Sequence, residues 1–138
     1  MTKYASTILI SNTNKVLAIL KNRPAWQAGS LNFPGGKVEP NETFEQCALR
    51  ELKEETDITV SSIEPCAELS GPDYHLMVYY AIVDDETINK ARAMTDEPVI
   101  VTTVDAFLEE DTNTVAYTKQ LLEATINDRD SLPLRIKN

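Results

Sequence analysis

Three glutamates, Glu51, Glu54 and Glu55, have the spacing that lets side chains meet on one side of a helix. Residues 43–56 are dominated by Glu, Ala, Leu and Lys, which favours a helix, and residues three and four positions apart are neighbours on its surface. The apolar arc of this helix consists of Phe44, Ala48, Leu49 and Leu52. On the helical wheel, Glu55 projects from within that arc and Glu51 lies at its edge.

Such an arrangement of carboxylates is costly unless something neutralises it. Like charges at this spacing repel, and a carboxylate beside a core face loses hydration. Either a protonated carboxyl with a raised pKa or a divalent cation relieves the cost. Oxygen ligands suit Mg²⁺, with Mn²⁺ as a substitute, and do not suit zinc. Gly35 and Gly36 precede the helix and leave room for a bare backbone carbonyl to approach the same cation.

The complete spacing is more specific than the glutamates alone. It resembles the Nudix box, Gly-x5-Glu-x7-Arg-Glu-U-x-Glu-Glu-x-Gly-U, in which U is a bulky aliphatic residue. The matching residues are Gly36, Glu42, Arg50, Glu51, Leu52, Glu54, Glu55 and Ile58. The lead-in Phe33-Pro34-Gly35-Gly36 is also similar to that of the family. We identify a resemblance to the Nudix hydrolases, and to their small MutT-like members in particular because the chain is short.

One position departs from the box, because Asp57 stands where the family has its last glycine. That glycine follows the helix, where a left-handed backbone is easiest for glycine. Aspartate tolerates this conformation better than most residues. We therefore expect a small cost in stability and no loss of metal ligands.

The resemblance implies a magnesium-dependent hydrolase that cleaves the diphosphate linkage of a nucleoside triphosphate or of another nucleoside-diphosphate derivative, as in MutT-like housecleaning of the nucleotide pool. It implies that Glu51, Glu54 and Glu55 bind the metal together with the Gly35 carbonyl. It also makes Glu51 and Glu54 catalytic, with Arg50 orienting a catalytic glutamate through an ion pair. Which carboxylate activates the attacking water stays open.

Four further residues are candidates for substrate contacts: Arg23, Phe33, Gly36 and Lys37. Arg23 and Lys37 carry charges suited to phosphate. Phe33 has a ring that can stack on a base, although core packing is the alternative.

Acidic residues outside the helix are candidates for supporting roles. Glu97, with its neighbour Asp96, precedes an expected strand and can supply a further carboxylate; a solvated acidic loop is the alternative. Glu42 is interpreted as structural, as a water-mediated metal contact, or as an acidic residue favoured by the helix dipole.

The remaining pattern predicts an α+β fold, namely a Nudix fold with a mixed β-sheet sandwiched between α-helices, in one domain over residues 1–138. The expected strands are residues 7–10, 16–20, 31–33, 58–69, 74–83 and 99–104, with a short one near Val38. Further helices are expected over residues 86–94 and 113–126, and residues 128–138 show no clear signal. The strand at 74–83 is almost continuously apolar, which indicates a central position covered on both faces.

Composition limits the partners. A formal net charge of −9 disfavours nucleic-acid binding, and the sequence has no added DNA-binding segment. We expect a small nucleotide substrate and a monomer or homodimer. No leader peptide or membrane-spanning run is visible, and two isolated cysteines suit a reducing compartment, so the cytoplasm is the expected location.

Other functions remain open at this stage. One alternative is hydrolysis of dinucleoside polyphosphates, ADP-ribose, NADH or capped RNA. A different class is a non-catalytic Nudix-like domain that senses nucleotides. Retention of Glu51, Glu54 and Glu55 favours an enzyme.

Overall fold

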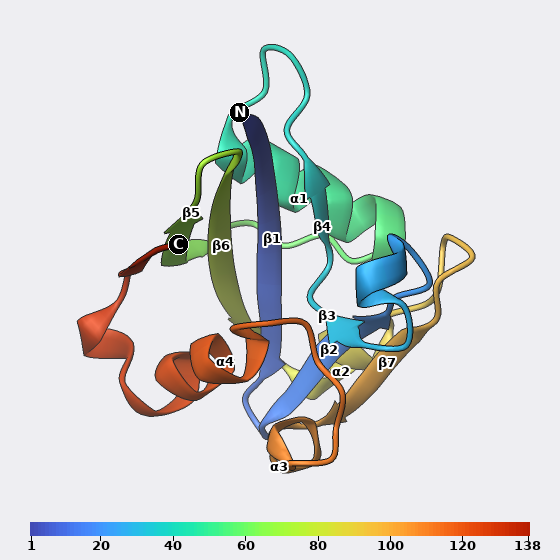
Figure 1. Cartoon of the computed structure of the whole chain (residues 1–138). Helices are drawn as coiled ribbons and strands as arrows, with labels where there is room; N and C mark the ends of the chain where they lie inside the picture. The colour runs from blue at the N-terminus through green and yellow to red at the C-terminus, as the bar shows by residue number, and fades with distance from the viewer.

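A mixed eight-stranded sheet forms the centre of the computed structural model, which describes all 138 residues (Figure 1). The strands are β1 (Thr2–Ser11), β2 (Lys15–Leu20), β3 (Leu31–Asn32), β4 (Gly35–Lys37), β5 (Glu64–Ser70), β6 (Tyr74–Val83), β7 (Val99–Thr103) and β8 (Leu134–Lys137). The main order is β3-β2-β1-β6-β5-β8, while β4 pairs with β1 and β7 pairs with β2.

Helices and short turns of 3-10 helix connect and cover these strands. They are η1 (Ala25–Gln27), α1 (Phe44–Thr56), α2 (Asp85–Asn89), α3 (Val104–Leu108), α4 (Thr118–Asn127) and η2 (Arg129–Ser131). None of the helices is both long and apolar enough to cross a membrane.

The two longest strands, β1 and β6, lie in the middle of the sheet and pair in parallel from Thr2 opposite Tyr74 to Ser11 opposite Val83. The antiparallel neighbour of β6 on its other side is β5, whose register shifts between Pro65 and Ala67. The predicted central position of residues 74–83 is therefore confirmed.

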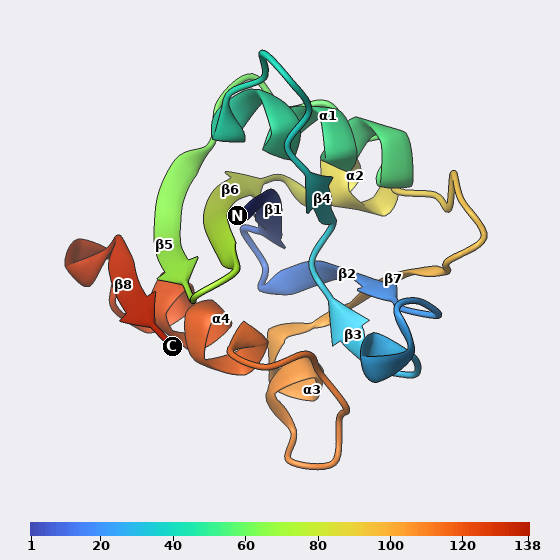
Figure 2. The ribbon, with the colours of Figure 1, turned by 45° about the horizontal axis from the view of Figure 1, so that its top comes forward.

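Helices cover both faces of the sheet (Figure 2). On one face, α1 and α2 pack on a core that includes Leu9, Leu17, Leu52 and Ile88. On the other face, α3 and α4 cover a second core that contains Ile8, Ile10, Val78, Phe107, Leu121 and Leu122. The alternation of β1 side chains between the two cores follows from the two-residue period of a strand. The predicted sandwich of a mixed sheet between helices is confirmed.

The central helix α1 is fixed at both ends by its own residues. At its start, the Thr43 hydroxyl accepts from the Gln46 N–H and the Gln46 side chain accepts from the Thr43 N–H, which together form a capping box. At its end, Asp57 adopts a left-handed backbone with φ 62°. The expected conformation at this departure from the Nudix box is confirmed.

Several predicted boundaries were wrong. Residues 58–63 are not a strand, the helix expected over 113–126 begins only at Thr118, and the helix expected over 86–94 is the short α2. Residues 128–138 showed no clear signal, but β8 pairs in parallel with β5. Gly35 and Gly36 belong to strand β4, whereas Val38, where a strand was expected, lies just beyond it. Strands β4 and β8 are short and depend on pairing with distant strands, so their local sequence carries little signal.

Candidate active site

Strand β4 and helix α1 bring two glycines against two glutamates. The Gly35 N–H donates to Glu55 Oε2 at 2.9 Å. At Gly36, an added Cβ would lie 2.6 Å from the Glu51 carboxylate carbon, so this close approach requires glycine. The position of β4 is fixed by its antiparallel pairing with β1, in which Gly36 lies opposite Ala5. Two of the carboxylates named from the sequence, Glu51 and Glu55, therefore lie against the glycine pair.

Glu55 is buried, with 8% of its surface exposed. Burial raises the pKa of its carboxyl to about 8, and the neighbouring Glu51 carboxylate adds to the shift. The charge of Lys21 and the Gly35 N–H act in the opposite direction. The carboxyl thus lacks enough positive charge around it to ionise at its ordinary pKa.

Arg50 connects several carboxylates at the solvent side of α1. Its Nε and Nη2 donate to Glu42 at 2.7 Å and 3.0 Å, and its Nη1 donates to Glu51 at 2.8 Å and to Glu54 at 3.1 Å. Hydrogen bonding to Glu42 is the largest cause of the raised pKa of the Arg50 guanidinium. The same contact lowers the pKa of Glu42 to about 2. Glu42 is therefore ion-paired with Arg50, which also contacts Glu51 and holds its carboxylate in place.

The chemistry of these residues suits a divalent cation. No group of three or more His, Cys, Asp or Glu side chains is already arranged to hold a metal ion. The donors are all oxygens, as magnesium prefers. Glu55 is a buried carboxyl that needs positive charge, and Gly36 leaves the Glu51 carboxylate unobstructed. Glu54 is the outlying member, because its side chain is 55% exposed and is turned towards Arg50.

Glu97 and Asp96 lie in the segment before β7, and each is engaged by the loop after β2. Glu97 is 5% exposed and accepts from the Asn22 N–H at 2.7 Å and from Lys21 Nζ at 2.9 Å. Burial would raise the pKa of Glu97, but these hydrogen bonds keep it below its ordinary value. Asp96 pairs with Arg23, and both side chains are largely exposed. A solvated loop, the alternative for Glu97, is therefore wrong.

Phe33 lies in the core and not at an open surface. It is 4% exposed, and its ring stacks on Phe107 with the centroids 5.6 Å apart. This burial does not support the predicted stacking of Phe33 on a substrate base, and core packing accounts for its position.

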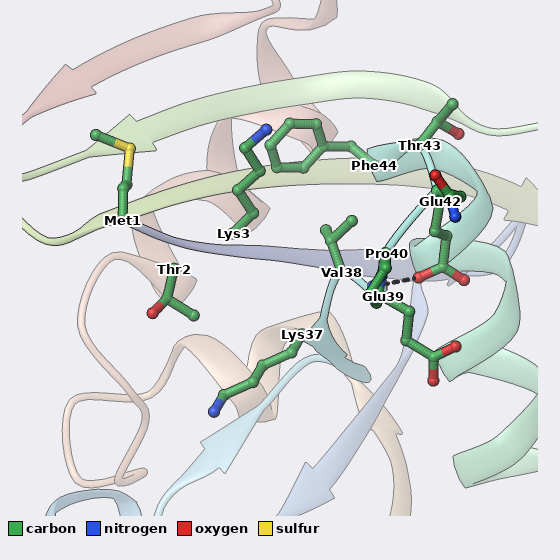
Figure 3. A pocket seen from close by; sticks show the side chains of 11 residues that line it. Met1, Thr2, Lys3, Lys37, Val38, Glu39, Pro40, Glu42, Thr43 and Phe44 are labelled. Atoms are coloured by element: carbon green, nitrogen blue, oxygen red, sulfur yellow. Dashed lines mark hydrogen bonds between the residues drawn. The ribbon is translucent and has the colours of Figure 1, made fainter.

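Lys37 lines an open pocket of about 670 Å³ (Figure 3). The pocket is formed by the start of β1 and by the segment from Lys37 to Phe44, and Lys3 and Phe44 lie close together on one side of it. Because side chains alternate along a strand, Lys37 points to the face of β4 opposite the one on which Gly36 meets Glu51. Lys37 thus follows Gly36 directly in the chain but projects away from the Glu51 carboxylate that Gly36 meets.

The sequence reasoning missed Lys21. This residue follows directly after β2, and its side chain is 17% exposed and bonded to Glu97. The only feature in the sequence that pointed to Lys21 was its place directly after the apolar, β-branched run of residues 16–20. The signal was weak, because surface lysines at strand ends are common.

Comparison with known proteins adds an independent line of support. The family model described as NUDIX domain matches residues 1–123. The 8-oxo-dGTP diphosphatase of Escherichia coli (strain K12) is 35% identical over 84 residues, which cover 59% of this chain and 65% of that protein. The CTP pyrophosphohydrolase of the same organism is 41% identical over 78 residues, which cover 52% of this chain and 56% of that protein. The matched segments thus span less than two thirds of each relative.

A solved structure shares the fold over almost the whole chain. The NUDIX domain of Shewanella oneidensis NrtR, crystallised with ADP ribose, superposes with a TM-score of 0.77. The superposition covers 95% of this chain and 88% of that one, at 19% sequence identity. At this identity the likeness concerns the fold alone.

Proposed function

Because this chain belongs to the Nudix family, we propose that it is a magnesium-dependent hydrolase of phosphoric anhydrides, with Mn²⁺ as a substitute. Its substrate is a nucleoside triphosphate or another nucleoside-diphosphate derivative, and residues 1–138 form the one domain that carries the activity. The observation that carries the proposal is the buried Glu55 beside Glu51 at the glycine pair.

Glu51, Glu54, Glu55 and the Gly35 carbonyl would hold the cation. When bound, the cation neutralises diphosphate charge and lowers the pKa of the attacking water. Glu51 and Glu54 are positioned by Arg50, and one of them is the candidate base for that water.

The names of two relatives support nucleoside triphosphates as the first class to test. One is named for 8-oxo-dGTP and the other for CTP. The net charge of −9 supports a small substrate over a nucleic acid. Arg23 is the proposed phosphate contact, which requires its release from Asp96. Lys37, the other cation predicted from the sequence, projects away from the proposed metal ligands and is not part of this proposal.

The deciding experiment measures product release with and without Mg²⁺ over a panel of nucleotides. The panel contains common and oxidised nucleoside triphosphates, ADP-ribose, NADH and dinucleoside polyphosphates, with products separated by chromatography. Glu55→Gln is expected to lower turnover by several orders of magnitude while preserving the fold, because it removes a metal ligand. Glu45→Gln, an exposed change on the same helix, is the matched control and should keep wild-type turnover.

Two results would contradict the proposal. Wild-type turnover in Glu55→Gln at saturating Mg²⁺ would show that Glu55 is not a metal ligand. If no compound in the panel is hydrolysed but one nucleotide binds tightly, the result would support a non-catalytic domain that senses nucleotides.

A further inference from the structure

Residues 92–98, which we call the bridging segment, join the end of helix α1 to the end of strand β2 (Figure 1). Near the start of the segment, the Met94 N–H donates to the Glu55 carbonyl at 3.2 Å. At its other end, the Leu20 N–H donates to the Pro98 carbonyl at 2.9 Å. The segment therefore connects a proposed metal ligand to the residue that precedes the loop after β2.

Glu97 is the buried charged residue of the bridging segment, with 5% of its surface exposed. Its Oε2 accepts from the Asn22 N–H at 2.7 Å and from the Arg23 N–H at 3.4 Å. Its Oε1 accepts from Lys21 Nζ at 2.9 Å. Both carboxylate oxygens are thus occupied by the loop after β2, and hydrogen bonds to an ionised acceptor are stronger than those between neutral groups.

Asp96, the preceding residue, holds the same loop in a different way. Its carboxylate pairs with the Arg23 guanidinium, and the two side chains are 62% and 63% exposed. An exposed ion pair contributes little free energy, so it opens readily when another anion is present. The backbone of Arg23 is therefore fixed by Glu97, while its guanidinium is held only at the surface.

We propose that Glu97 is a positioning residue, which fixes the backbone of residues 22 and 23 so that the Arg23 guanidinium reaches the phosphate groups of the nucleotide. The inference rests on the proposed function, because it requires Arg23 to contact that phosphate. It gives Glu97 a role through the main chain of the loop, in place of the further carboxylate that the sequence suggested. The observation that carries it is that both oxygens of Glu97 already have donors in this loop.

The test measures kcat and KM for the preferred nucleoside triphosphate with Mg²⁺. Glu97→Ala removes the acceptor and is expected to raise KM at least about tenfold while kcat changes by less than about threefold, because a displaced phosphate contact weakens ground-state and transition-state binding alike. Glu97→Gln keeps an oxygen for the N–H groups, so both constants should stay within about threefold of wild type.

Asp96→Asn is the matched control. It removes a negative charge at the adjacent position but leaves the hydrogen bonds of Glu97 to the main chain in place. Its KM should stay constant or fall, because the Arg23 guanidinium is released. A rise in KM equal to that of Glu97→Ala would overturn the inference.

A second comparison asks whether Glu97 acts through Arg23. Glu97→Ala should raise KM no further when Arg23 is already glutamine, since the two changes remove the same contact. Equal increases in the two backgrounds would overturn the inference. So would a loss of kcat in Glu97→Gln of several orders of magnitude, which would identify a base or a metal ligand.

Hydrogen exchange of the Asn22 amide tests the anchor without activity. Exchange should be faster in Glu97→Ala and close to wild type in Glu97→Gln, because the amide loses its acceptor only in the first variant. Unchanged exchange in Glu97→Ala would overturn the inference. If Glu97→Ala does not fold, Glu97→Asp replaces it in every comparison, because its carboxylate is one methylene shorter and withdraws from the loop.

Failure of the proposed function gives a different pattern. In that case the wild type itself would show no turnover that depends on Mg²⁺. If the wild type hydrolyses nucleotides but Arg23→Gln leaves KM unchanged, the hydrolase stands and only the inference about Glu97 is wrong.

Discussion

Gly36 and Glu51 approach each other so closely that a Cβ at position 36 would lie 2.6 Å from the carboxylate carbon and Oε1 of Glu51. The glycine of the Nudix box is thus explained here by space, and not by an unusual φ angle. The clashing atoms are the far end of a flexible side chain, which can rotate away at little cost. The fold therefore tolerates a larger residue at this position. Such a residue would, however, force the Glu51 carboxylate out of its present orientation.

Gly36→Ala is expected to lower turnover at least about tenfold, because the methyl group displaces a proposed metal ligand by more than an active site accepts. The free energy of unfolding should change by less than about 1 kcal/mol, since no backbone has to move. Turnover with the preferred nucleotide and urea unfolding of the metal-free protein would measure the two effects.

Gly35→Ala provides the contrast. A Cβ there would lie 2.5 Å from the Ala5 carbonyl oxygen and 2.8 Å from the Ser6 Cα, so the pairing of β4 with β1 would have to shift. This variant should lose more than about 2 kcal/mol of stability, in line with overpacking against rigid neighbours. Equal losses of stability in the two variants would refute the distinction between them.

Replacing Arg50 with glutamine should lower turnover and Mn²⁺ affinity by about ten- to a hundredfold, as is usual when the residue that orients a metal ligand is lost. The reason is that Arg50 Nη1 fixes Glu51 at 2.8 Å and Glu54 at 3.1 Å. Arg92→Gln is the control, because it removes the same charge from an exposed pair with Asp57 near the end of α1. A KM that rises while turnover and Mn²⁺ affinity stay constant would assign Arg50 to substrate binding instead.

The features that the sequence predicted well are local or periodic. Helix α1, the long strand β6 and the left-handed Asp57 each follow from neighbouring residues: a run of helix-forming residues, an apolar run and a helix end. The placement of Glu55 within the apolar arc of α1 predicted its burial, because 3.6-residue periodicity fixes which face a helical residue occupies.

The features that the sequence did not predict depend on distant partners. Strand β8 is four residues long and exists through pairing with β5, more than sixty positions earlier. The burial of Glu97 depends on donors at Lys21 and Asn22 in another loop, and nothing around Glu97 in the sequence indicates them. Phe33 could have stacked on a ligand or packed in the core, and its contact with Phe107 decided between them.

Asp57→Gly, which restores the residue of the family motif, should leave the free energy of unfolding within about 1 kcal/mol of wild type. Glycine relieves the left-handed backbone at φ 62°, but it removes the exposed ion pairs with Lys53 and Arg92. Asp57→Ala loses the same pairs and keeps the backbone cost, so it should be less stable than Asp57→Gly by about 1 kcal/mol. Urea unfolding would measure both, and an alanine variant as stable as the glycine variant would show that the backbone conformation costs nothing here.

The ion pair between Glu42 and Arg50 should make stability depend on pH in acid. Hydrogen bonding to Arg50 is the main cause that lowers the pKa of Glu42 from its ordinary 4.5 to about 2. A carboxyl with a lowered pKa in the folded state stabilises the fold above the unfolded-state pKa, and this contribution is lost as pH falls through the folded-state value.

The difference in the free energy of unfolding between the wild type and Glu42→Gln should therefore be largest above about pH 4.5 and shrink towards pH 2. Denaturant unfolding of the metal-free proteins over a pH series measures this difference. Glu45→Gln lies on the neighbouring exposed turn of α1 and is the control, whose difference from wild type should show no such decline. A difference for Glu42→Gln that grows as the solution becomes more acidic would reverse the sign and show that the Arg50 contact does not favour the ionised form of Glu42.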